Sequence, residues 1–123
     1  KKKISYRGTF LISVPSQPPR NFSVTVSSST SVTASWKLPS VKYRHGIVLG
    51  FKLYYKKTGS SGLPNTLTIR NESVGTVEFT GLDKYTEYEF QVLAFTSAGD
   101  GPKSSAEVAR TKEDGKKCKL IRI

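Results

Sequence analysis

Hydrophobic and polar residues alternate along much of the chain, in short runs that end at turn-forming residues. Residues 22–26, 32–37, 50–56 and 88–94 place an apolar side chain at every second position, and shorter strands are expected at 67–69, 77–80 and 105–111. A period of two is typical of β-strands with one buried face, and no stretch of helical length repeats its apolar residues every 3.6 positions. Clusters of glycine, serine and proline at 58–64 and 97–102 mark turns. Seven short strands joined by turns predict an all-β fold.

The same alternation sorts strand residues into inner and outer sets, which predicts a seven-stranded antiparallel immunoglobulin-like β-sandwich. On the third strand the inner set is Phe51, Leu53 and Tyr55, and the outer set is Lys52, Tyr54 and Lys56. On the longest strand the inner set is Tyr88, Phe90, Val92 and Ala94. This arrangement leaves Leu93 and Phe95 on the outer face.

Several short motifs follow one another in a specific order. Two prolines precede the first strand, a lone tryptophan closes the second, and Gly50-Phe51-x-Leu53-x-Tyr55 forms the third. Thr80-Gly81-Leu82 then leads to Thr86-x-Tyr88-x-Phe90-x-Val92, and Gly99-x-Gly101-Pro102-x-Ser104 follows. Over residues 15–113 this order resembles the fibronectin type III domain.

The resemblance implies a core that holds Trp36, Leu82, Tyr88 and Phe90. Trp36 needs an apolar layer around its ring and an acceptor for its indole N–H. Tyr88, six residues after Leu82, fits a tyrosine corner, in which the hydroxyl bonds to backbone a few residues upstream.

Basic residues outnumber acidic ones, 20 against 9, so the formal net charge is +11. We expect a basic N-terminal extension or linker at 1–14, a fibronectin type III domain at 15–113 and a basic tail at 114–123. Charge runs at chain ends are usually solvated, and the alternative is an electrostatic contact with an acidic polymer. No nucleic acid partner is expected, because no zinc-ligand spacing, helix-turn-helix pattern or RNA-binding aromatic motif accompanies the charge.

The sequence offers little for catalysis. With 123 residues it has room for one domain, and no run approaches the roughly 18 apolar residues of a membrane span. His45 is the single histidine and Cys118 the single cysteine, so we expect neither a metal cluster nor a paired nucleophile. Glu87 and Glu89 share one strand face and are expected to be solvated rim charges or to pair with Lys52 and Lys56 of the neighbouring strand. We therefore expect no enzyme and no cofactor, and the role of Cys118 stays open.

Two surfaces are candidates for binding a partner. The first, the apolar patch, consists of Tyr54, Leu93 and Phe95 on the outer sheet face. Either a partner binds it, or a neighbouring domain or residues 9–14 cover it. The second, the basic pole, is implied by the family resemblance, in which loops 38–47, 71–76 and 96–103 converge. It would combine Lys42, Arg44, Arg70 and Lys103, as a site for sulfated glycan or an acidic protein face, or simply as a soluble basic surface.

Asn21 and Asn71 each begin an Asn-x-Ser sequon and are candidate N-glycosylation sites. With the family resemblance they favour an extracellular location within a membrane-anchored or secreted parent protein, and a cytoplasmic array is the alternative. We therefore predict a non-catalytic protein-interaction or adhesion module of a receptor or adhesion protein. Its expected partners are a protein ligand and neighbouring domains of the same parent. The alternatives are a heparin- or sulfated-glycan-binding module and a structural spacer in a tandem array.

Overall fold

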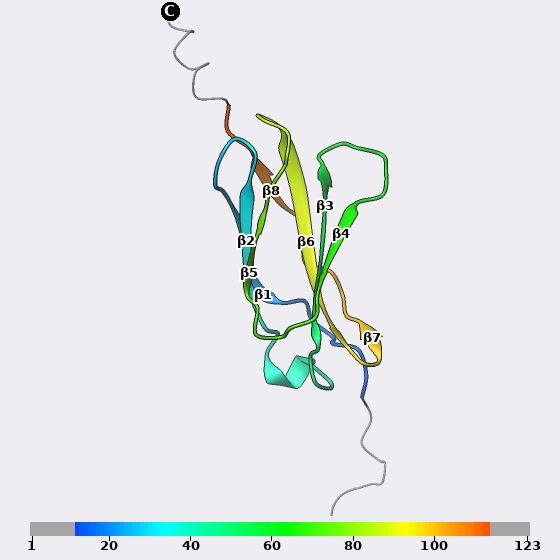
Figure 1. Cartoon of the computed structure of the whole chain (residues 1–123). Helices are drawn as coiled ribbons and strands as arrows, with labels where there is room; N and C mark the ends of the chain where they lie inside the picture. Colours follow the sequence, from blue (N-terminus) through cyan, green and yellow to red (C-terminus); the bar gives the residue numbers. More distant parts are fainter. Residues whose placement is uncertain (1–11, 114–123) are drawn as a thin grey trace, which may run out of the picture.

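A computed structural model describes residues 12–113 of the chain. Its regular structure is almost entirely β-strand, in two facing antiparallel sheets (Figure 1). Within this range the one helical element is the short 3-10 turn η1 (Val41–Tyr43). The described part of the chain contains no helix long and apolar enough to cross a membrane. The predicted all-β sandwich is therefore confirmed.

The two sheets differ in size. The smaller sheet has the order β1-β2-β5, built from β1 (Arg20–Val26), β2 (Val32–Lys37) and β5 (Thr76–Phe79). The larger sheet has the order β4-β3-β6-β7, built from β4 (Asn65–Ile69), β3 (Gly50–Lys57), β6 (Glu87–Thr96) and β7 (Gly99–Asp100). The last strand, β8 (Glu107–Arg110), also pairs with β6.

Each predicted run overlaps one observed strand, and β7 is an addition to the seven. Its two residues lie inside the predicted turn 97–102, where Phe95 pairs with Asp100 and Thr96 with Gly99. The chain after β6 therefore turns back and pairs with the end of β6 as a short hairpin.

The register of β3 and β6 decides which residues meet in the core. These strands pair along the whole of β3, from Gly50 opposite Phe95 to Lys57 opposite Tyr88. Because side chains alternate across a sheet, the inner pairs are Phe51–Ala94, Leu53–Val92 and Tyr55–Phe90. Phe51, Leu53, Val92, Phe90 and Ala94 are all fully buried or nearly so.

Aromatic rings from both sheets fill the space between them. Trp36 of β2, 4% exposed, meets Phe51 of β3 in an edge-on contact with 5.4 Å between ring centroids. Phe79 of β5 lies 5.2 Å from Phe90 of β6 and 4.7 Å from Tyr55 of β3. The expected acceptor for the indole N–H of Trp36 is missing, because its Nε1 is buried without a hydrogen-bond partner in the described structure. Packing of the ring, not a hydrogen bond, therefore holds Trp36 in place.

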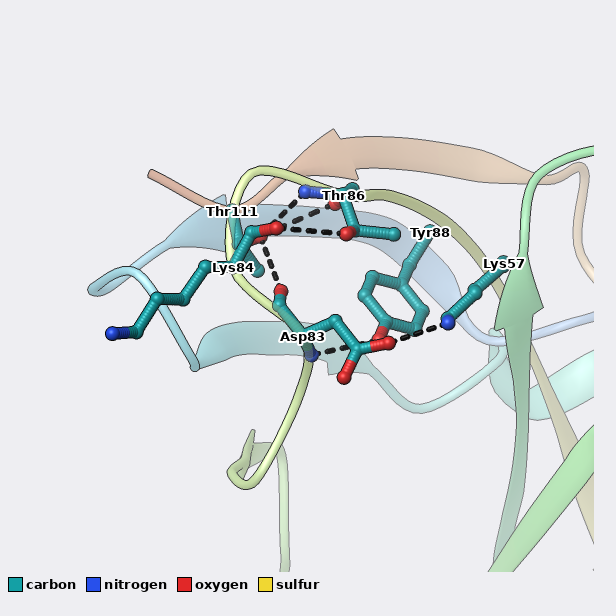
Figure 2. Close-up of polar contacts among 6 residues, drawn as sticks. All are labelled: Lys57, Asp83, Lys84, Thr86, Tyr88 and Thr111. Atoms are coloured by element: carbon teal, nitrogen blue, oxygen red, sulfur yellow. Dashed lines mark hydrogen bonds and ion pairs between the residues drawn. The ribbon is translucent and has the colours of Figure 1, made fainter. Parts of the chain in front are cut away.

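A polar cluster closes the sandwich at the pole where the described chain leaves it (Figure 2). The Tyr88 hydroxyl accepts a hydrogen bond of 2.9 Å from the backbone N–H of Asp83, which is the predicted tyrosine corner. The Thr111 hydroxyl donates to the Asp83 carbonyl oxygen (2.7 Å) and accepts from the Thr86 N–H (2.9 Å). Thr86 in turn donates from its hydroxyl to the Lys84 carbonyl oxygen. The turn before β6 is thus tied to the residue that follows β8.

The Asp83 carboxylate of the same cluster forms an ion pair with Lys57 (Figure 2). The carboxylate accepts a hydrogen bond from the Lys57 ammonium and attracts its charge, and together these effects raise the pKa of Lys57 above its ordinary 10.5.

The chain enters the sandwich at the opposite pole (Figure 1). We call this the entry pole, formed by residues 12–19, 38–49, 70–75 and 97–101. The Ser13 N–H donates to the His45 carbonyl oxygen, and the Thr96 hydroxyl donates to the Ser13 carbonyl oxygen, both at 2.8 Å. The Ser16 N–H donates to the Tyr43 carbonyl oxygen at 2.9 Å. Hydrogen bonds to the sandwich thus already involve Ser13, two residues before the predicted domain start.

Replacing Trp36 with alanine should lower the free energy of unfolding by about 3–5 kcal/mol, because the change leaves a large cavity beside Phe51. Trp36→Phe should cost less than Trp36→Ala, since it keeps an aromatic ring in the layer and the indole N–H makes no hydrogen bond to lose. Urea unfolding of the three proteins measures both differences. A Trp36→Ala protein with the parent's unfolding midpoint would refute this account of the core.

Replacing Tyr88 with phenylalanine should lower the free energy of unfolding by about 1–3 kcal/mol, because the Asp83 N–H loses its acceptor in a partly buried site. Tyr54→Phe is the matched control. It also removes a phenolic hydroxyl, but the Tyr54 hydroxyl makes no hydrogen bond within residues 12–113. Urea unfolding should show a loss for Tyr88→Phe only. Equal effects of the two changes would contradict the tyrosine corner.

The Lys57–Asp83 pair should give stability a pH dependence in the alkaline range. A lysine whose pKa is raised by folding stabilises the native state fully below its unfolded pKa, and this contribution is lost as pH rises through the folded pKa. Thermal unfolding of the parent and Lys57→Gln should therefore differ at neutral pH and converge above 10.5. The control is Lys37→Gln, which removes an exposed lysine elsewhere. A difference that does not change with pH would exclude the pair as its source.

Candidate binding surfaces

The apolar patch is not an exposed surface in the structure. Leu93 and Phe95 face outward as predicted but are only 3% and 5% exposed, while Tyr54 is partly exposed. Lys52 Nζ and the Arg70 guanidinium carbon lie 5.7 and 5.8 Å from the Phe95 ring centroid. Of the two alternatives for this face, the structure therefore favours cover over an open partner surface for Leu93 and Phe95.

Long cationic side chains cover these rings. Lys103 Nζ lies 4.0 Å from the centroid of the Tyr54 ring, and Lys52 is held in place by an ion pair of 3.0 Å with Asp100. Cations are attracted to aromatic faces, and the methylene stems of lysine and arginine bury apolar surface while their charged ends stay in water. Residues 9–11, proposed as part of a cover, lie outside the described residues. Ile12 and Ser13 instead contact the loop at His45–Gly46 and the side chain of Thr96.

The four residues expected to form one basic pole are separated into two groups. Arg70 and Lys103 lie on the outer face of the larger sheet, over Phe95 and Tyr54. The chain around Lys103 runs alongside β6, because the N–H of the next residue donates to the Val92 carbonyl oxygen at 2.8 Å. The predicted loops do meet at the entry pole (Figure 1), but the side chains of Arg70 and Lys103 lie over the sheet face.

Lys42 and Arg44 do lie at the entry pole. Lys42 Nζ is 5.1 Å from the Tyr43 ring centroid, and the Arg44 Nε donates to the Pro39 carbonyl oxygen at 2.7 Å. His45, between them and the entering chain, bonds through its Nε2 to the Ser16 hydroxyl at 2.9 Å. Of the four residues of the predicted basic pole, this corner therefore contains Lys42 and Arg44.

Two adjoining hollows open at this corner. Their volumes are about 500 and 430 Å³, and both are lined by Leu38, Arg44 and Glu72. The larger also reaches Val41 and Ile47, and the smaller also reaches Arg20, Lys37 and the buried Trp36. The corner is thus the place where basic side chains, exposed apolar side chains and concave surface coincide.

Arg20 is a residue of this corner that the sequence patterns did not single out. Its Nε donates to the Leu38 carbonyl oxygen at 2.8 Å, next to the Pro39 carbonyl that holds Arg44. It opens β1 opposite Lys37, which closes β2. The sequence signal was available: a basic residue begins one strand and another ends its hairpin partner, so antiparallel pairing brings them to one end of the sheet.

Three carboxylates of the larger sheet are engaged in ion pairs. Glu89 lies 3.9 Å from Lys56, as expected, but Lys52 pairs with Asp100, and Glu87 lies 3.5 Å from Arg110. Residues 12–113 contain no group of three or more His, Cys, Asp or Glu side chains that could hold a metal ion. Cys118 lies outside the described residues.

Both sequon asparagines are exposed. Asn21 lies at an irregularity in the β1–β2 pairing with a φ of 53°, a left-handed conformation that asparagine tolerates better than most residues. Asn71 follows β4, and its Oδ1 accepts a hydrogen bond of 2.9 Å from the Ser73 N–H. Both side chains are therefore accessible from solvent.

Comparison with known proteins agrees with this architecture. The chain is 40% identical over 103 residues to protein sidekick-1 of Gallus gallus, and 40% identical over 106 residues to cell adhesion molecule DSCAM of Homo sapiens. These matches cover 83% and 86% of this chain, but the chain spans only 5% of the length of either relative.

Among solved structures, the third fibronectin III domain of the human KIAA0343 protein matches with a TM-score of 0.75 and 28% identity, over 87% of this chain and 90% of that one. The family model for the fibronectin type III domain matches residues 17–110. The resemblance found in the motifs is confirmed, and the chain belongs to the fibronectin type III domain family.

Proposed function

We propose that the chain is a non-catalytic protein-interaction module in the extracellular region of an adhesion or receptor protein. The observation that carries this proposal is the 40% identity to a cell adhesion molecule over 86% of the chain. The small share of each relative that the chain spans supports a role as one unit among many in a longer protein.

The arrangement of the sandwich supports the same role. The described chain enters at one pole and leaves at the other (Figure 1). Neighbouring domains can therefore follow one another end to end while the sheet faces and loops stay accessible. In this proposal, residues 1–14 and 114–123 connect the domain to its neighbours, and glycans attach at the exposed Asn21 and Asn71.

The chemistry of the described surface favours binding over catalysis. Lys52, Lys56 and Lys103 on the larger sheet form ion pairs or cover an aromatic ring, which are structural roles. The sulfated-glycan alternative gains no support, because Arg70 and Lys103 lie apart from Lys42 and Arg44 instead of forming one dense anion site. The spacer alternative gains none either, because its proposed buried face is covered by side chains of the same domain.

The chain, biotinylated and assembled into tetramers on streptavidin, should stain cells through a protein on their surface. Trypsin treatment of the cells should remove the staining, and heparin lyase should leave it unchanged. Flow cytometry measures both, with streptavidin tetramers that carry no chain as the negative control. Staining that heparin lyase abolishes would replace the proposed function with glycan binding, and no staining of any adhesive cell type would contradict it.

A further inference from the structure

We propose that the two hollows at the entry pole bind an acidic peptide segment of a protein partner. In this inference one carboxylate side chain of the partner lies between Arg20 and Arg44, and apolar side chains next to it in sequence pack on Val41 and Ile47. The inference rests on the proposed function, since it names the surface and the chemistry by which this domain meets a protein.

The two arginines are already positioned to receive an anion. Each guanidinium is anchored through its Nε, Arg20 to the carbonyl oxygen of Leu38 and Arg44 to that of Pro39, at 2.8 and 2.7 Å. Neither arginine has an ion-pair partner among residues 12–113, so the Nη groups of both stay available. An arginine fork donates two parallel hydrogen bonds to a carboxylate, and anchoring it beforehand reduces the entropy lost on binding.

The local charge favours an anion. Arg20, Lys37 and Arg44 line the smaller hollow, against the single carboxylate of Glu72. Three cations around one acid leave a positive potential that attracts a negatively charged group. Glu72 has no ion-pair partner of its own in the described range, so it opposes binding without cancelling either arginine.

The apolar side chains beside the arginines distinguish a peptide from a sulfated glycan. Val41 and Ile47 are each 75% exposed and line the larger hollow, which shares Arg44 with the smaller one. Contiguous exposed apolar side chains with a polar rim are typical of protein-binding surfaces. A sulfated glycan would pair with the arginines but leave Val41 and Ile47 exposed to water. An acidic residue flanked by leucines would pair with the arginines and also bury Val41 and Ile47.

The probe is a capped synthetic peptide with one aspartate between leucines, and its control carries asparagine at that position. Each is titrated into the full chain, labelled with ¹⁵N and produced without glycans. The Nε–Hε signals of Arg20 and Arg44 should shift with the aspartate peptide. The asparagine peptide should bind about tenfold more weakly, because its side chain has no charge and offers one acceptor oxygen instead of two.

Variants of matched charge separate this site from general basic attraction. Arg44→Gln should lower the affinity for the aspartate peptide about tenfold. Arg44→Lys should lower it less, since lysine keeps the positive charge but lacks the two-pronged guanidinium. Arg70→Gln and Lys103→Gln remove the same charge from the sheet face and should change nothing. Glu72→Gln, an exposed change that preserves the Asn71 sequon, should strengthen binding.

Several results would overturn the inference. They are equal affinity for the two peptides, no binding of either, equal weakening by Arg70→Gln and Arg44→Gln, or arginine signals that respond to a heparin fragment more strongly than to the peptide. Thermal unfolding of each variant establishes that it is folded, and Glu72→Gln tests the site without touching an anchored side chain.

Cell staining separates this inference from the proposed function. Staining that is sensitive to trypsin but unchanged by Arg44→Gln would refute the entry-pole site and leave the adhesion module standing. Staining that Arg44→Gln reduces and Arg70→Gln does not would support both. If no tetramer stains cells, the proposed function is contradicted. The peptide titration then remains the test of whether the entry-pole site binds an acidic peptide.

Discussion

Aromatic rings from the two sheets meet in the middle of the sandwich, and this contact positions every surface of the domain. Trp36 and Phe79 come from the smaller sheet, Phe51 and Phe90 from the larger one. Burial of large aromatic surfaces supplies most of the free energy that holds such sheets together. Since the indole N–H of Trp36 has no partner in the described structure, packing of its ring is what holds it between the sheets. The positions of the loops at each pole depend on how the two sheets pack, because the loops connect their strands.

The outer face shows how a basic domain covers its own apolar residues. Lys52, Arg70 and Lys103 extend over Phe95 and Tyr54, so part of the positive charge has a packing role. At the entry pole the cationic side chains do not cover the apolar ones. Val41 and Ile47 stay exposed there, beside arginines whose Nη groups are unpaired in the described chain. Two regions of similar composition thus differ in what remains available to another molecule.

Strand positions and facing could be predicted because alternation is a local property of the sequence. The inner residues of β3 and β6 follow from a period of two, and the Tyr88 hydroxyl finds its backbone partner a few residues upstream, within reach of a motif. The full cover over Phe95 and Tyr54 could not be predicted, since Arg70 follows β4 and Lys103 follows β7, and only the folded sheet brings them to this face. Arg20 could have been placed at this end of the sheet from the expected pairing of its strand with β2, but its contact with the Leu38 carbonyl oxygen appears only in the structure.

The chain enters the sandwich at the same pole as the two hollows, and this has a consequence for any longer protein that contains it. Whatever is attached ahead of Ile12 is tethered within a short distance of Arg20 and Arg44. A tethered segment has an effective concentration that reaches the millimolar range for short flexible linkers. Residues 1–11 carry Lys1, Lys2, Lys3 and Arg7 and no acid, so this tethered sequence adds positive charge near the corner and attracts an acidic partner instead of competing with it for the site.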